Sequence, residues 1–250
     1  MDSPPFFASV DDLRLQPELS ATALVYELRT PLTTVHGFLE TLVHHGEDLE
    51  PELRQQMLST AYRNSALLAQ RVAEIIELQR IYAGSVLLSP TRCDLGEQLH
   101  RFLQDRAGML SAHDIMLDVD EGVMVVADVD ALRHTLANIT ADAVLHTRPH
   151  STISIIALPQ DDRALVLVSD GGEPIDPDDL PHVFDPTYRG DGRRRGCGVG
   201  LAIAHQYVTH MGGDIHARSE PGHGTTVWFS LPLADPQPEH PILLADDTRP

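Results

Sequence analysis

Three groups of residues in this 250-residue chain have the types and spacing to hold a nucleotide. Asn138 and Asp142 lie one helical turn apart, so their polar groups can reach a magnesium ion and a triphosphate together. Asp170 follows an apolar strand, where a buried carboxylate can accept a hydrogen bond from the adenine amino group. A glycine-rich stretch further on lets backbone amides approach phosphates and then opens a helix, whose N-terminus favours anions. Its glycines are Gly196, Gly198 and Gly200.

A different chemistry depends on Tyr26, in the run Val25-Tyr26-Glu27-Leu28-Arg29-Thr30-Pro31-Leu32. A phenol has a pKa near 10 and is mostly protonated at neutral pH, whereas an imidazole with a pKa near 6.5 is a nucleophile there. Tyr26 is therefore a poor acceptor for a phosphoryl group.

Apolar residues at three- and four-residue steps predict two long amphipathic helices between about Glu18 and Ala83. Pro31 falls inside the first helix and should kink it. Gly46 and Pro51 mark the loop between the helices. One hairpin cannot bury both apolar stripes, so we expect a homodimer with a four-helix bundle.

After Pro90 the pattern changes to mixed strands and helices, which predicts a two-layer α/β sandwich. Asp94 and Glu97 resemble a capping box that opens a helix to about Leu110. Two more helices are expected over Val129–His146 and Val199–Met211. Strands are expected over Ile115–Val119, Val123–Ala127, Thr152–Leu158, Ala164–Ser169, Asp214–Arg218 and Thr225–Leu231. The expected domains are an N-terminal segment (1–17), the helical hairpin (18–90), the α/β domain (91–234) and a tail (235–250).

Composition excludes several classes of function. The net charge of −19 disfavours nucleic acid and anionic membrane surfaces as partners. No apolar run approaches the roughly 20 residues that span a bilayer, so no membrane insertion is expected. All 18 basic residues are arginine, which excludes a P-loop lysine. Cys93 and Cys197 form neither a disulfide framework nor a metal-site spacing, and a cytoplasmic protein is the simplest interpretation.

The run around Tyr26 resembles the phosphoacceptor box of bacterial sensor histidine kinases, His-Glu-Leu-Arg-Thr-Pro-Leu, with Tyr26 in the histidine's position. Through Thr34 it is most similar to the box of DivL-type tyrosine-substituted kinases, which bind response regulators and modulate other kinases. The resemblance implies that Glu27 is the general base for a histidine acceptor. It also implies that Thr30 matches the residue that positions water to dephosphorylate a partner.

The second region resembles the ATP-binding domain shared by histidine kinases, DNA gyrase and one class of heat-shock chaperones, the GHKL or Bergerat fold. The matching segments, in the family's order, are Asn138–Ala143, Asp170–Gly172, Val183–Arg189, Gly196–Leu201, Met211–Ile215 and Gly222–Thr225. The resemblance implies ATP and Mg²⁺ as ligands and a lid over Tyr188–Gly196. The implied nucleotide-binding residues are Asn138, Asp142, Asp170, Gly172, Gly196, Gly198, Gly200, Leu201 and Thr225. Asn138 and Asp142 would hold the metal.

Four departures from the family pattern concern the acceptor, metal and phosphate positions. Besides Tyr26, they are Asp142 in place of the magnesium-bearing Asn, Leu145 in place of a phosphate-contacting lysine, and Pro174 at a glycine position. Weak ATP binding follows from these changes. The other histidines, His146 among them, are predicted to lie on the surface.

These observations leave three hypotheses. The leading one is a pseudokinase without histidine autophosphorylation that docks a response-regulator receiver domain, and possibly another histidine kinase. The first alternative is an enzyme, either an active sensor histidine kinase or a phosphatase of a phosphorylated receiver that uses Thr30. The second is a nucleotide-gated switch without phosphotransfer.

Overall fold

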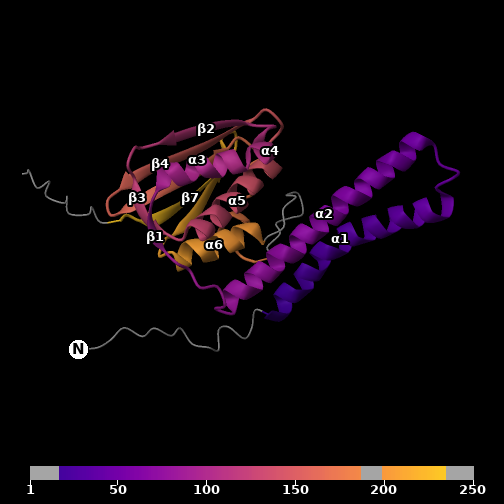
Figure 1. Cartoon of the computed structure of the whole chain (residues 1–250), viewed down its shortest axis with the longest axis horizontal. Coiled ribbons are helices and arrows are strands. Elements are labelled where there is room, and N and C mark those ends of the chain that lie inside the picture. The colour runs from indigo at the N-terminus through magenta and orange to yellow at the C-terminus, as the bar shows by residue number, and fades with distance from the viewer. Residues whose placement is uncertain (1–16, 187–198, 235–250) are drawn as a thin grey trace, which may run out of the picture.

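The N-terminal part of the structure is a helical hairpin. The computed structural model describes residues 17–186 and 199–234, with side chains from Leu28 onward. Helices α1 (Pro17–His45) and α2 (Pro51–Tyr82) pack against each other as an antiparallel pair (Figure 1). Pro51 occupies the start of α2, where the absence of an N–H costs no helical hydrogen bond. The predicted hairpin is confirmed, and α1 continues through Pro31.

A five-stranded sheet forms one layer of the second part, in the order β2-β4-β5-β7-β6. Its strands are β2 (Asp114–Val119), β4 (Thr152–Gln160), β5 (Arg163–Asp170), β6 (Ile215–Glu220) and β7 (Gly224–Pro232). Strands β2 and β4 are parallel, and the other neighbours are antiparallel. A separate antiparallel pair consists of β1 (Thr91–Asp94) and β3 (Met124–Ala127).

Helices form the other layer (Figure 1). They are α3 (Leu95–Asp105), the short α4 (Ala107–Leu110), α5 (Val129–His146) and α6 (Gly200–His210), and a 3₁₀ turn spans Leu180–His182. The Asp94 carboxylate caps α3 by accepting from the backbone N–H of Glu97 at 3.0 Å. The predicted α/β sandwich and this cap are confirmed.

Two details differ from the prediction. The helix that begins at Leu95 ends at Asp105 instead of Leu110, because Arg106 leaves the helical conformation and a separate turn follows. The strand β1 was not predicted. Only four residues long, it owes its extended shape to pairing with β3, which no local pattern encodes.

The core lies between the sheet and the helix layer. Alternate residues of the central strands point into it, among them Ile153 and Ile155 of β4 and Val166 of β5. Leu78 and Ile81, at the end of α2, are buried in this same cluster. The last turns of the hairpin are therefore fixed to the α/β part by apolar packing. Among the described residues, no helix is long and apolar enough to cross a membrane.

The hairpin leaves an apolar surface uncovered. Large side chains exposed on α1 and α2 are Leu32, Leu39, Val43, Leu53, Leu58, Tyr62, Leu67, Val72, Ile76 and Tyr82. Val43 and Tyr62 are 78% and 76% exposed, and contiguous exposed apolar side chains of this kind are typical of interaction surfaces. A second copy of the chain could cover these side chains by forming a four-helix bundle.

Leu39→Glu is expected to weaken self-association at least tenfold, because a carboxylate would have to be desolvated in the bundle. Sedimentation velocity at micromolar concentration measures the effect. Thr33→Glu is the control, since it adds the same charge at an exposed polar position of α1. An unmodified chain that sediments as a stable monomer would contradict this expectation.

Candidate functional site

Asp170 stands at the end of a central strand, as a nucleotide-recognising carboxylate would. It is the last residue of β5 and only 7% of its surface is exposed. Its Oδ1 atom accepts a hydrogen bond from the backbone N–H of Gly172 at 2.8 Å, which fixes the carboxylate's direction. The oxygens of an ionised carboxylate only accept hydrogen bonds, which suits an amino group on a ligand.

Close backbone contacts around Asp170 explain the neighbouring glycines. A side chain at position 172 would collide with the carbonyl group of His146, at the end of α5. A side chain at position 224 would collide with the carbonyl of Asp170, and Gly224 has a φ of +76°, which favours glycine. Thr225 lies opposite Asp170 in the sheet register and is 2% exposed. The structure thus brings the predicted residues 170, 172 and 225 together.

Asn138 meets the start of α6. A Cβ atom at position 200 would lie 3.0 Å from the Oδ1 atom of Asn138, so Gly200 lets the amide oxygen approach the backbone closely. The Nδ2 atom of Asn138 donates to the carbonyl oxygen of His134 at 2.9 Å, which leaves the amide oxygen directed at the helix N-terminus. Leu201, the next residue of α6, is buried. The site therefore joins a carboxamide oxygen and a helix N-terminus, groups that suit a metal–phosphate pair.

Asp142 lies next to a histidine, a contact that was not predicted from the sequence. The Oδ1 atom of Asp142 lies 3.5 Å from Nε2 of His146, one turn further along α5. The His146 side chain is only 9% exposed, so the prediction that it lies on the surface is wrong. The end of α5 is covered there by the loop that contains Gly172. Leu145, by contrast, is 49% exposed.

The acceptor-box residues lie on α1. Tyr26 and Glu27 are within the helix, but their side chains are outside the described part of the structure. Thr30 is exposed, one turn further on, and its carbonyl oxygen accepts from the Thr34 hydroxyl at 3.0 Å. Pro31 has no N–H, so the helical hydrogen bond to the carbonyl of residue 27 is missing next to the acceptor position.

Part of the predicted site falls outside the described residues: Gly196, Gly198 and the expected lid from Tyr188 to Gly196. At the edge of that segment, Phe184 packs on His205 of α6, with ring centroids 5.8 Å apart. Burial lowers the pKa of His205.

Within the described residues, no group of three His, Cys, Asp or Glu side chains could hold a metal ion. A magnesium ion at Asn138 and Asp142 would therefore depend on ligands from a nucleotide.

One polar cluster was missed by the sequence analysis. Glu77 of α2 contacts both His134 of α5 and Tyr207 of α6. No spacing could have indicated it, because the three residues come from three separate helices. His134 lies one turn before Asn138, and that proximity was the only available signal.

Comparison with known proteins gives two domain matches. Residues 20–84 match the His Kinase A (phospho-acceptor) domain. Residues 127–235 match the histidine kinase-, DNA gyrase B- and HSP90-like ATPase. Together the two matches include the hairpin, α5, Asp170 and Thr225.

Individual proteins agree with these matches. The sensor histidine kinase MtrB of Mycobacterium leprae is 33% identical over 235 residues, which are 87% of this chain and 41% of MtrB. The chain spans less than half the length of the first curated relatives it matches. Full-length ShkA, solved in complex with AMPPNP, is 26% identical with a TM-score of 0.61, over 87% of this chain and 46% of that one. Histidine kinase ThkA, solved with response regulator protein TrrA, has a TM-score of 0.70 at 21% identity, and the match covers 90% of this chain and 64% of that one.

Proposed function

The chain belongs to the histidine kinase family, and from this premise we propose that it is a two-component signalling protein that docks a response-regulator receiver domain without phosphorylating itself on histidine. The observation that carries the proposal is Tyr26 at the acceptor position, on a helix that is otherwise formed as the family requires. A protonated phenol cannot attack ATP as an imidazole does at neutral pH. The hairpin would then serve as a binding surface.

The hairpin is well suited to such a surface. Two long antiparallel helices extend away from the sheet (Figure 1), and α1 carries the acceptor box. ThkA, which has a similar fold, was solved in complex with the response regulator protein TrrA. We therefore place the receiver against the hairpin near Tyr26, whose ring offers a large contact area of the kind that dominates interfaces.

The proposed ligand of the α/β domain is ATP. Asp170 is a buried acceptor for the adenine amino group, and Gly172 and Gly200 keep the backbone close to the site. Asn138 and Asp142 would hold Mg²⁺, which would neutralise part of the phosphate charge when bound. Because Asp142 carries a negative charge where the family has a neutral amide, we expect this binding to be weak.

A second candidate function, dephosphorylation of a receiver, is favoured by the exposure of Thr30 on α1. Its hydroxyl is one turn from Tyr26 and open to a docked partner. In that case the unmodified chain would shorten the lifetime of a phosphorylated receiver, and Thr30→Ala would abolish the effect while Thr33→Ala would not.

Receiver docking is tested by substitutions at Tyr26. Tyr26→Ala is expected to weaken binding of a receiver domain about tenfold or more, because it removes a large aromatic contact. Tyr26→Phe keeps the ring and should bind like the unmodified chain. Calorimetric titration against receiver domains from the same genome measures both. A loss of binding in Tyr26→Phe would show that the hydroxyl matters and that the contact is not an apolar one.

A further inference from the structure

Ser219, near the end of β6, contacts three groups that surround the proposed adenine site. It pairs in the sheet with Thr225, which in turn pairs with Asp170. The Oγ atom of Ser219 accepts a hydrogen bond from the backbone N–H of Ile175 at 2.8 Å and donates to the carbonyl oxygen of Gly224 at 3.0 Å. It also lies 3.0 Å from the Oγ1 atom of Thr225. A hydroxyl has one hydrogen and two acceptor lone pairs, so these three partners use its full capacity.

Each of the three partners adjoins Asp170. Ile175 belongs to the loop that follows Asp170, and only 4% of its surface is exposed. Gly224 lies so close that a Cβ atom there would collide with the carbonyl oxygen of Asp170. Thr225 is the buried residue opposite Asp170 in the register of β7 and β5. A single hydroxyl on β6 therefore connects the loop after β5 to the first residues of β7.

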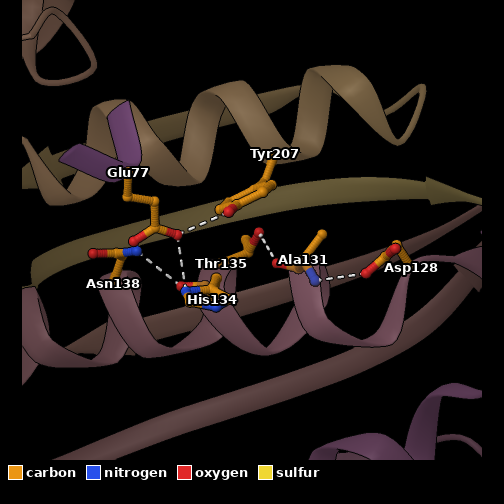
Figure 2. Close-up of polar contacts among 7 residues, drawn as sticks. All are labelled: Glu77, Asp128, Ala131, His134, Thr135, Asn138 and Tyr207. Atoms are coloured by element: carbon orange, nitrogen blue, oxygen red, sulfur yellow. Dashed lines mark hydrogen bonds and ion pairs between the residues drawn. The ribbon is translucent and has the colours of Figure 1, made fainter. Parts of the chain in front are cut away.

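The two ends of the proposed nucleotide site are supported in different ways. On the metal side, Asn138 is held within α5, where its Nδ2 atom donates to the carbonyl oxygen of His134 (Figure 2). On the adenine side, the Asp170 carboxylate accepts from the backbone N–H of Gly172. Gly172 belongs to the same loop that Ser219 attaches to β6. The direction of the carboxylate thus depends on the position of this loop, and Ser219 helps to fix that position.

We propose that Ser219 is a positioning residue for adenine. It holds the loop after Asp170, together with Thr225, in the arrangement that lets the Asp170 carboxylate select the adenine amino group. This inference rests on the proposed binding of ATP to the α/β domain and names a residue that determines the preference for adenine. Without the hydroxyl, the N–H of Ile175 and the carbonyl of Gly224 each lose a hydrogen bond, and the loop is held less firmly. The proposed metal and phosphate contacts come from α5 and the start of α6, so they would be retained.

Discrimination between ATP and inosine triphosphate (ITP) by the full chain tests this role. ITP carries a carbonyl oxygen where ATP carries the amino group, so a carboxylate acceptor favours ATP. Displacement of a fluorescent ATP analogue by Mg-ATP and by Mg-ITP gives the ratio of the two affinities. Ser219→Ala should lower the preference for ATP about three- to tenfold and leave the affinity for ITP unchanged. Ser219→Thr keeps the hydroxyl and should keep the preference.

Amide hydrogen exchange at Ile175, measured without nucleotide, reports on the hydrogen bond itself. In Ser219→Ala this amide should exchange about tenfold faster, because its N–H has lost the Oγ acceptor. Faster exchange at Ile175 with an unchanged preference for ATP would mean that Ser219 only stabilises the loop. That result would overturn the inference, as would unchanged exchange together with an unchanged preference.

Ser169→Ala is the matched control. The Oγ atom of Ser169 lies 2.9 Å from Oγ1 of Thr226, so this variant also removes a contact between two hydroxyls beside Asp170, but on the opposite face of the sheet. The ATP preference and the exchange of Ile175 should match those of the unmodified chain. An equal loss of preference in Ser169→Ala or in Ser219→Thr would overturn the inference. An unmodified chain without any preference for ATP over ITP would instead show that the proposed adenine site at Asp170 is wrong, and the inference would fail with it.

Discussion

Combining Tyr26→His with Asp142→Asn is expected to give an acid-labile phosphoprotein on incubation with Mg-ATP, whereas Tyr26→His alone should give little. Histidine supplies the missing nucleophile beside Glu27. Asparagine removes a negative charge next to the triphosphate and should tighten Mg-ATP binding on the order of tenfold. The structure adds a second consequence, because Asp142 lies 3.5 Å from His146 and its replacement also alters that contact.

The two single variants separate the effect of the missing histidine at position 26 from the effect of the negative charge at position 142. Asp142→Asn without the histidine should bind Mg-ATP more tightly and still lack acid-labile phosphate. Strong phosphorylation of Tyr26→His alone would contradict the expectation. It would mean that the nucleotide site is competent with Asp142 in place and that only the acceptor has been lost.

Asp170→Asn is expected to weaken ATP binding by about 10- to 100-fold, to the point where it is no longer detectable. The substitution replaces a charged acceptor with a neutral amide, and hydrogen bonds to charged groups are worth about 1.5–3 kcal/mol. The asparagine Oδ1 can still accept from the backbone N–H of Gly172, so the fold should be retained. Titration with a fluorescent ATP analogue measures the change.

Asp178→Asn is the matched control for this experiment. Asp178 is an exposed aspartate eight residues further along the chain, and its substitution removes the same charge without touching β5. Nanomolar affinity in the unmodified chain would show that the effect of Asp142 has been overestimated. Undiminished binding in Asp170→Asn would place the adenine elsewhere.

Much of the fold was predictable because its signals are local. The apolar stripes of the hairpin, the Asp94 cap and the bounds of α5 each follow from residues within a few turns of one another. The environment of Asp170 was predictable for a related reason. Asp170 follows an apolar strand and Gly172 comes two residues later, a local pattern that resembles the family's nucleotide-binding motif.

The features that were not predicted from the sequence depend on contacts between distant segments. The extended conformation of β1 exists through its register with β3. The predicted surface position of His146 is wrong, and the loop after β5, which lies against the end of α5, is a contact that helix periodicity does not encode. Glu77 and Tyr207 are 130 residues apart in sequence, and only the packing of α2 on α6 brings them together. Side-chain partners of this kind cannot be inferred from periodicity.

The most direct test of the central claim is incubation of the unmodified chain with γ-labelled ATP, quenched in parallel with acid and with base. Phosphohistidine is lost in acid and phosphotyrosine survives it, so the two quenches identify the labelled side chain. The account predicts no stable label under either condition, while receiver binding is retained. An acid-labile label would show that another histidine replaces the missing acceptor, and an acid-stable label on Tyr26 would show that the phenol itself is phosphorylated. Either result would contradict a pseudokinase.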